Sequence, residues 1–354
     1  PGLATHASMP AHAYASGGAD RRLSPEAIAD ALMSLAGPGP ALSAAAQTEG
    51  EPLERLFKLF EANFRISVQD YKLGTIERRV KRRMYMHRID TLERYLQFCL
   101  QSPRELSDAY QDLFVSVTHF FRDKAPFERI ATTVIPQLLA KKSPGEPIRI
   151  WVPGCASGEE AYSLSMLWLD ALKERAYQNP LHIFGTDIDA HCLGVARLGI
   201  YSANLLNNVG AERLAKYFIK RPGSSQISRA VRDTVIFSTH DVLHDAPFSN
   251  LDMISCRNLL IYLKTPAQSR VLKAFHYALR PSGSLLLGIS ESIGDHTDLF
   301  AQASPCSKLF GRKQSVISRL EESEFAPPAA KATEHRSAAL VSAPAEAAQQ
   351  PSRP

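Results

Sequence analysis

The stretch IRIWVPGCASGEEAY (Ile148 to Tyr162) decides the fold of this chain, together with HIFGTDID (His182 to Asp189). The first stretch has the pattern of a buried strand, a tight glycine-containing loop and the start of a helix. The second has the pattern of another apolar strand, and it ends in two acids. In doubly wound sheets the first kind of loop lets the backbone approach a nucleoside, and the acid after the second strand accepts ribose hydroxyls. The two stretches therefore predict an α/β fold with a nucleoside site at the carboxyl ends of its strands.

The loop in the first stretch is acidic and is not a G-x-G-x-x-G loop. Gly154 and Gly158 stand on either side of Ala156, and Glu159 and Glu160 begin the helix. Two carboxylates at a helix start would repel a pyrophosphate but would attract a cation. S-adenosylmethionine carries a sulfonium and an ammonium group and has no phosphate. The loop therefore favours S-adenosylmethionine over NAD or ATP.

Composition excludes several classes of protein. A chain of 354 residues holds one large or two modest domains, and its net charge of +5 is mild. No apolar run approaches the length of a membrane span, and the N-terminus lacks the pattern of a secretory signal. The five cysteines are odd in number and, like the histidines, show no metal-ligand spacing, so we expect no disulfide framework and no metal. A reducing cytoplasm fits this cysteine usage.

Composition and periodicity divide the chain into four parts. Residues 1–50 are rich in alanine, glycine, proline and serine, which predicts a largely irregular linker or remnant with one short helix after Ser24. Residues 51–124 carry apolar side chains at helical spacing and predict a small helical domain. Residues 125–315 alternate strands with helices. Residues 316–354 are rich in alanine, proline and glutamate without periodicity, which predicts a disordered tail.

The alternation in the third part predicts a mostly parallel sheet with helices on both faces. The expected strands are Ile148 to Val152, His182 to Thr186, Val235 to Thr239, Met253 to Cys256 and Ser284 to Ile289. The expected helices are Glu159 to about Arg175, Ala190 to Leu198 and Ala267 to Leu279. The alternation breaks between about residues 202 and 234, where a helical stretch and a hairpin pattern predict a small antiparallel β-subdomain.

Four segments resemble the CheR family of chemoreceptor glutamate methyltransferases in sequence and in order: VTHFFRD, IWVPGCASGEEAYS, FGTDID and CRNLLIY. The resemblance covers roughly Leu53 to Lys313. It implies a class I methyltransferase sheet with a small N-terminal helical domain. It also implies S-adenosylmethionine as the methyl donor and side-chain carboxylates of bacterial chemoreceptors as the acceptor.

A second resemblance concerns the N-terminal part. Residues Met9 to Leu32 are similar to the tail of a CheB-type methylesterase domain, which is sometimes fused ahead of a CheR-type domain. Nothing matches the serine-bearing loop of the esterase, and the chain lacks an initiator methionine. We therefore expect a fragment of a CheB–CheR fusion that has no esterase activity.

The donor site is expected to include acids of the two stretches Ile148 to Tyr162 and His182 to Asp189. Asp187 is assigned to the ribose hydroxyls, because Asp189 is the better candidate to cap the following helix. Glu159 and Glu160 could simply complement the dipole of the helix that they begin. By resemblance, Glu160 faces the donor, and Gly154 lets the backbone come close to it.

Two further segments are expected at this site. Asp241 follows the strand VIFST, and a polar residue there commonly receives the adenine amino group while the next N–H, of Val242, meets a ring nitrogen; alternatively Asp241 only caps a turn. Thr118 and Arg122 lie in SVTHFFRD, where the helical part meets the sheet. Arg122 could merely pair with Asp123 or cap a helix. By resemblance it points into the donor site, where its guanidinium suits a carboxylate.

The segment ISCRNLLIYL follows a buried strand and holds Arg257, Asn258 and Tyr262. One interpretation is an internal salt bridge for Arg257, because a buried arginine needs an anionic partner. The functional interpretation places Arg257 and Asn258 beside the donor and Tyr262 at the site of methyl transfer. The segment is not Asp-Pro-Pro-Tyr or Asn-Pro-Pro-Tyr, the pattern of enzymes that methylate amino groups of nucleic-acid bases.

The helix pattern IERRVKRRMYMHR (Ile76 to Arg88) has six basic residues and one acid. Ile76, Val80 and Met84 are expected to form its buried stripe. The outward basic residues assigned to receptor binding are Arg78, Lys81 and Arg82. A charge run is usually a solvated face, but a solvated face mixes both signs. The imbalance suggests an anionic partner, either an acidic receptor helix or a nucleic acid.

These patterns predict a cytoplasmic, monomeric protein that binds S-adenosylmethionine, and the resemblance implies that it is a protein-glutamate O-methyltransferase. Its expected partners are the cytoplasmic helices of chemoreceptors, without nucleic acid and without membrane insertion. Arg122 and Tyr262 are the candidates for holding the acceptor carboxylate. One alternative is a nucleic-acid methyltransferase, which would need a base-methylating motif or an aromatic-rich face. Another is a signalling module that binds the donor or a receptor without turnover.

Overall fold

The computed structural model describes residues 50–64, 68–113, 118–303 and 308–314. Contacts divide the chain into the units Pro1–Val316 and Ile317–Pro354, and every described residue belongs to the first unit. The short helix expected after Ser24, the stretch that resembles a methylesterase tail and the expected C-terminal tail lie outside the described residues.

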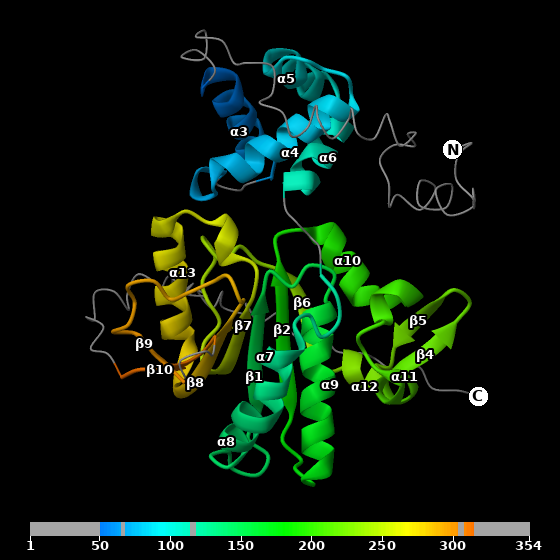
Figure 1. Ribbon diagram of the computed structural model, residues 1–354, viewed down its shortest axis with the longest axis vertical. Helices are drawn as coiled ribbons and strands as arrows, with labels where there is room; N and C mark the ends of the chain where they lie inside the picture. Colours follow the sequence, from blue (N-terminus) through cyan, green and yellow to red (C-terminus); the bar gives the residue numbers. More distant parts are fainter. Residues whose placement is uncertain (1–49, 65–67, 114–117, 304–307, 315–354) are drawn as a thin grey trace, which may run out of the picture. The chain divides into compact units, whose positions relative to one another are not determined.

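Amphipathic helices form the N-terminal part of the described chain, which we call the helical domain (Figure 1). Its elements are α3 (Gly50–Phe64), η2 (Val68–Asp70), α4 (Leu73–Met86), α5 (Leu92–Gln101) and α6 (Pro103–Leu113). Leu56 and Phe60 of α3 and Tyr95 of α5 are fully buried in its core. Thr91 caps α5 by accepting a hydrogen bond from the N–H of Arg94 at 3.4 Å.

A seven-stranded sheet forms the larger part of the fold, in the order β6-β2-β1-β7-β8-β10-β9. Its strands are β1 (Ile148–Pro153), β2 (Leu181–Asp187), β6 (Val235–Thr239), β7 (Leu251–Cys256), β8 (Leu279–Leu287), β9 (Phe300–Gln302) and β10 (Leu309–Arg312). The five strands expected from the sequence are present and pair in parallel. The bounds expected for the last one were wrong, because β8 begins at Leu279, where a helix end was expected, and stops before Ile289. The antiparallel strands β9 and β10 were not expected, since runs of three and four residues carry little periodicity.

Helices cover the sheet as the alternating pattern predicts. The helices that follow the larger strands are α9 (Glu159–Glu174), α10 (Ala190–Leu198) and α13 (Thr265–Ala278). A continuous helical run precedes β1: α7 (Lys124–Arg129), η3 (Ile130–Val134) and α8 (Ile135–Leu139). Figure 1 shows α9 lying along β1 and β2, and Tyr162 and Trp168 of α9 are fully buried in the core there. Trp151 of β1 is also fully buried, and its ring contacts those of Phe248 and Phe275. No helix in the described ranges is both long and apolar enough to cross a lipid bilayer.

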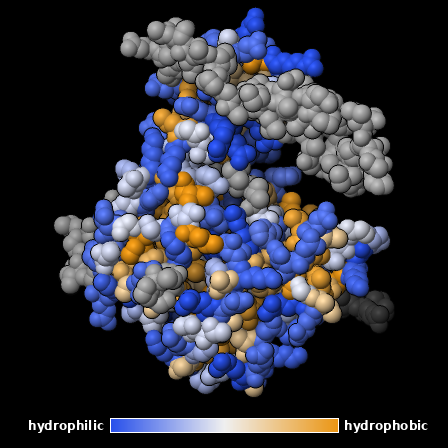
Figure 2. All heavy atoms as spheres, in the orientation of Figure 1, coloured by the Kyte–Doolittle hydropathy of each residue, from blue (hydrophilic) through white to orange (hydrophobic). Residues whose placement is uncertain are grey.

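The expected β-subdomain is a three-stranded antiparallel sheet in the order β3-β5-β4. Its elements are β3 (Ile200–Ser202), η4 (Ala203–Leu206), α11 (Ala211–Tyr217), β4 (Phe218–Arg221), β5 (Ser224–Ile227) and α12 (Arg229–Arg232). Phe120 anchors this sheet, because its ring meets those of Tyr201 and Phe218 at 4.9 Å and 5.6 Å. Hydrophobic residues gather over α10 and the small sheet in Figure 2, and the exposed ones include Leu198 and Ile219.

Candidate functional site

A cavity lies where β1, β2, β6 and β7 reach their carboxyl ends. Six residues expected at a donor site line it: Gly154, Asp187, Asp241, Val242, Asn258 and Tyr262. The helical domain supplies further lining residues that the sequence did not indicate: Val68, Tyr71, Thr75, Ile76 and Leu113. The cavity therefore combines the edge of a doubly wound sheet with side chains from a second domain, as ligand sites of such sheets often do.

The loop after β1 is built from left-handed backbone conformations. Gly154, Ala156 and Gly158 have φ values of 67°, 48° and 91°. A side chain at Gly154 would press on Leu259 at 3.3 Å, and one at Gly158 would lie 2.9 Å from both Ala196 and Phe237. Glycine is therefore needed at both positions, and the loop leaves its backbone open to the cavity.

Asp187 fixes this loop from the end of β2. Its carboxylate accepts hydrogen bonds from the N–H of Ala156 at 2.8 Å and the N–H of Asp189 at 3.0 Å. Burial raises the pKa of Asp187, and these backbone donors oppose the rise. The expected cap is confirmed: Asp189 caps α10 by accepting from the N–H groups of His191 and Cys192.

Glu160 and Arg257 form a buried ion pair behind the loop. Glu160 accepts from the hydroxyl of Ser255 at 2.6 Å and from Arg257 at 3.1 Å. Arg257 also donates to the carboxylate of Asp123 and to the carbonyl of Arg122, both at 2.8 Å, and its side chain is wholly buried. Burial raises the pKa of Glu160, while Arg257 and Ser255 lower it. Neither Glu160 nor Arg257 belongs to the described lining of the cavity, so the internal salt bridge weighed for Arg257 is present.

Asn258 and Tyr262 lie on a tight turn after β7 that contains η5 (Leu260–Tyr262). Asn258 has a φ of 61°, a conformation that asparagine tolerates better than most residues. The buried carboxylate of Glu291 holds the turn by accepting from the N–H groups of Asn258 at 2.9 Å and Leu260 at 2.7 Å. Sequence reasoning missed Glu291. The only signal was an acid shortly after the last predicted strand.

Asp241 both caps a turn and lines the cavity, so the two interpretations of this residue are compatible. Its carboxylate accepts from the N–H of Leu243 at 2.9 Å, and its own N–H donates to Asp245 at 2.8 Å. Thr118 and Arg122 are half-buried and are not among the described residues that line the cavity. Arg122 is tied to the site through its carbonyl, which accepts from Arg257.

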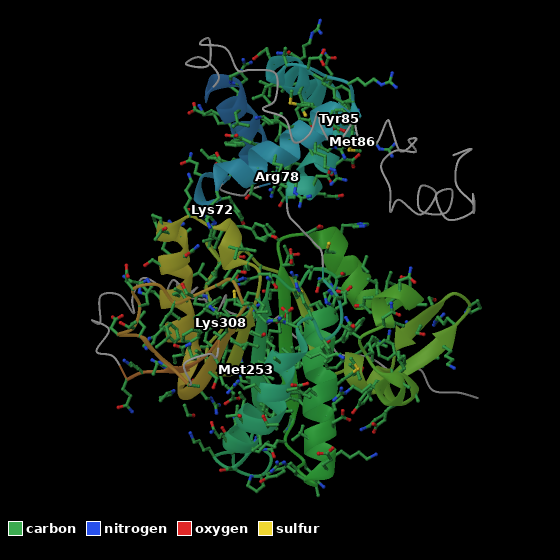
Figure 3. The ribbon with its side chains drawn as sticks, viewed as in Figure 1. Lys72, Arg78, Tyr85, Met86, Met253 and Lys308 are labelled. Atoms are coloured by element: carbon green, nitrogen blue, oxygen red, sulfur yellow. The ribbon has the colours of Figure 1, made fainter. Side chains whose placement is uncertain are left out.

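The basic helix is α4, and its excess of charge is partly internal. Arg78 and Lys81 are exposed, as Figure 3 shows for Arg78, and Arg82 is half-buried. Arg83 is buried instead of Met84, which is only half-buried, so the expected apolar stripe was wrong at that position. Arg83 donates to Glu105 at 3.0 Å and to Asp112 at 3.1 Å. These acids on α6 neutralise it within the helical domain.

The chemistry of the lining suits a cationic nucleoside better than a phosphorylated one. Two carboxylates, those of Asp187 and Asp241, belong to the lining, and none of its described residues is lysine or arginine. Burial and nearby carboxylates, that of Asp241 foremost, raise the pKa of the Tyr71 phenol, which reflects the negative potential there. S-adenosylmethionine fits this lining: carboxylates can accept from its hydroxyls and amino groups, and its sulfonium gains from the potential.

No three histidine, cysteine, aspartate or glutamate side chains within the described ranges are grouped so that they could hold a metal ion.

Comparisons with known proteins match nearly all of the described chain. Residues 116–308 match the family model "CheR methyltransferase, SAM binding domain", and residues 51–114 match "CheR methyltransferase, all-alpha domain". A chain of Vibrio cholerae, "Chemotaxis protein methyltransferase 2", is 35% identical over 58% of this chain and 72% of its own length. A chain of Borreliella burgdorferi, "Chemotaxis protein methyltransferase", is 28% identical over 70% of this chain and 90% of its own length.

A longer relative comes from Rhodobacter capsulatus and is described as "Uncharacterized 104.1 kDa protein in hypE 3'region". It is 35% identical over 72% of this chain. The match spans 27% of the length of that relative.

Proposed function

This chain belongs to the CheR methyltransferase family, and on that premise we propose that it transfers a methyl group from S-adenosylmethionine to glutamate side chains of chemotaxis receptors. The products would be glutamate methyl esters and S-adenosylhomocysteine. The observation that carries the proposal is the cavity at the strand ends, which has two carboxylates and no described lysine or arginine in its lining.

The donor supplies a methyl group bound to a positively charged sulfur. A carboxylate oxygen of the acceptor glutamate attacks the methyl carbon, the new C–O bond forms as the C–S bond breaks, and the electron pair of that bond stays on sulfur. The acceptor is already ionised at neutral pH, because a glutamate side chain has a reference pKa of about 4.3. A general base is therefore not needed. The protein has to orient the two groups in line and exclude water from the carboxylate.

Residues of the cavity take the binding roles in this proposal. Asp187 accepts hydrogen bonds from the ribose hydroxyls, and Asp241 and Val242 meet the adenine, while Gly154 and Asn258 shape the walls. The ion pair of Glu160 and Arg257 supports the loop after β1, and Thr118 lies at the junction with the helical domain. Tyr262 lines the cavity and is proposed to hold the acceptor carboxylate together with Arg122.

The activity itself is tested by incubating the protein with methyl-labelled donor and bacterial membranes that contain receptors. Methyl esters release volatile methanol on base treatment, whereas methylated bases do not. We expect base-labile label on the receptor band. Label in nucleic acid would favour the alternative methyltransferase, and donor binding without label transfer would favour a non-catalytic module.

Replacing Tyr262 with phenylalanine should lower turnover with little change in donor affinity. The ring keeps its place in the cavity, and the variant loses a hydrogen bond to a charged acceptor, which corresponds to roughly 10- to 150-fold in rate. Single-turnover label transfer at saturating receptor measures the rate, and calorimetry with S-adenosylhomocysteine measures the affinity. Wild-type turnover in this variant would remove its hydroxyl from the reaction.

Reversing the charge of Arg78 and Lys81 to glutamate should raise the KM for receptor, by about tenfold at low salt, and flatten its salt dependence. Both side chains are exposed on α4, whose packing rests on Ile76, Val80 and Arg83. Arg82 is half-buried, so the two exposed residues alone give the cleaner test.

The control for this surface is the same reversal at Lys173 and Arg175, which are exposed at the end of α9. It changes the net charge equally but on another element. If the two double variants raise the KM for receptor alike, the effect comes from net charge and α4 has no special role.

The remaining parts of the proposal rest on the sequence alone. The proposed substrate segments are cytoplasmic receptor helices, which places the activity in the cytoplasm, and the active unit is a monomer that needs no metal or nucleic acid. The likeness of the stretch Met9 to Leu32 to the tail of a CheB-type methylesterase domain is part of the proposal as well.

A further inference from the structure

A short segment of the helical domain, Val68 to Lys72, makes backbone contacts with the turn that carries Tyr262. The N–H of Lys72 donates to the carbonyl of Tyr262 at 2.8 Å, and the N–H of Lys264 donates to the carbonyl of Asp70 at 2.8 Å. Between them, Tyr71 forms an antiparallel bridge with Leu263. Lys72, labelled at the start of α4 in Figure 3, also donates through its ammonium group to the carbonyl of Ile261. The segment is therefore fixed against one side of the cavity.

The side chain of Asp70 contacts residues of two other elements. One carboxylate oxygen accepts from Arg270 at 2.6 Å, and the other lies 3.6 Å from Nε2 of His244. The other ring nitrogen of His244, Nδ1, lies 2.7 Å from Oδ2 of Asp241. Asp70, His244 and Asp241 thus form a chain of polar contacts that runs from the helical domain to a carboxylate in the lining of the cavity.

The chemistry of these three side chains fixes the direction of one hydrogen bond. A carboxylate only accepts, so the contact at 2.7 Å requires a proton of His244 on Nδ1, and Asp70 attracts the ring when a second proton is on Nε2. The other oxygen of Asp241 accepts from the N–H of Leu243. Each carboxylate oxygen is therefore held by one donor, and the carboxylate, with about four lone-pair sites in all, keeps capacity for a ligand.

An exposed pair of this kind contributes little to stability, because water competes with it and screens it. His244 is about half exposed, whereas the side chain of Asp241 is only 18% exposed and lines the cavity. The consequence of the contact is therefore expected in ligand selectivity rather than in the free energy of unfolding.

We propose that His244 is a positioning residue that orients the carboxylate of Asp241 toward the exocyclic amino group of the donor's adenine, and that Asp70 steadies His244. The helical domain would then take part in selecting the adenine base. This inference rests on the proposed function, in which Asp241 receives that amino group.

Three substitutions at one position separate the two contacts of His244. Alanine removes both. Asparagine places an amide N–H as many bonds from the backbone as Nδ1 and can keep the contact with Asp241. Glutamine extends its amide to about the position of Nε2, so it favours the contact with Asp70. His191→Ala, an exposed histidine on α10, serves as the control.

The probes are S-adenosylhomocysteine and its deaminated analogue, S-inosylhomocysteine, whose carbonyl stands where adenine has its amino group. Calorimetry gives the ratio of the two dissociation constants for each protein. The wild type and His191→Ala should prefer the adenine compound by about tenfold or more. In His244→Ala and His244→Gln the preference for the adenine compound should fall to one-third of the wild-type ratio or less. His244→Asn should keep most of the wild-type ratio, and Asp70→Ala should have an intermediate ratio.

If His244 had a merely structural role, all three His244 variants would unfold at a lower temperature. The asparagine and glutamine variants would then have the same ratio of dissociation constants. An unchanged ratio in His244→Ala, or equal ratios in the asparagine and glutamine variants, overturns the assignment of His244 while the proposed function stands. A wild-type protein that binds neither compound overturns the proposed function and the inference together.

Discussion

Replacing Arg257 with methionine should lower the free energy of unfolding by about 3–5 kcal/mol, as expected when one partner of a buried ion pair is removed. The guanidinium is wholly buried, and the carboxylate of Glu160 that faces it is 13% exposed. Methionine fills a similar volume but leaves this carboxylate with Ser255 as its remaining donor among the contacts described here. Urea unfolding followed by circular dichroism measures the loss.

A second change should restore much of the stability. Adding Glu160→Gln to Arg257→Met removes the stranded charge, and the amide oxygen can still accept from Ser255. If the double variant is as unstable as the single one, the loss does not come from an unpaired carboxylate. Because Arg257 does not line the cavity, the double variant should also bind donor better than a variant that lacks Asp187.

The loss in Arg257→Met should also shrink in acid. Burial raises the pKa of Glu160, and Arg257 lowers it, so the variant has a folded-state pKa still further above the unfolded value of about 4.3. A carboxyl group with a raised folded-state pKa takes up a proton on folding. Stability of the variant therefore rises as the pH falls through that pKa, and unfolding curves at several pH values test the sign.

Local patterns were enough to predict the sheet and part of the cavity. Buried strands that alternate with helices predict a parallel sheet, and the carboxyl ends of such strands meet at one edge, so Asp187 and Asp241 had to lie near each other. The cap formed by Asp189 also follows from local chemistry, because a cap stands directly before its helix.

Contacts between distant segments could not be predicted in this way. Tyr71 enters the cavity through a bridge to Leu263, and no local pattern marks two residues that far apart as partners. The burial of Arg83 could not be predicted from local sequence either. Positions 83 and 84 both lie near the buried face of α4, and only the location of Glu105 on α6 decides which of them is buried. A count of basic residues therefore overestimated the outward charge of the helix.

Replacing Asp187 with alanine should weaken donor binding by about 1.5–3 kcal/mol, or roughly 10- to 150-fold, because the carboxylate proposed to accept hydrogen bonds from the ribose is lost. The same carboxylate accepts from the N–H of Ala156, so the loop after β1 loses a support as well. Calorimetry with S-adenosylhomocysteine measures the affinity. An affinity equal to that of the wild type would remove Asp187 from the ribose site.

The matched control is Asp189→Ala, two residues further along the chain. Asp189 caps α10 and is not among the described residues that line the cavity, so its loss should cost about 0.5–2 kcal/mol of stability with a much smaller change in donor affinity. The pH dependence separates the two acids further. Burial raises the pKa of Asp187, and in the proposed binding mode ribose hydroxyls donate to its ionised form. Donor affinity of the wild type should therefore fall as the pH drops through that raised pKa. In Asp187→Ala this part of the pH dependence should disappear, whereas in Asp189→Ala it should remain.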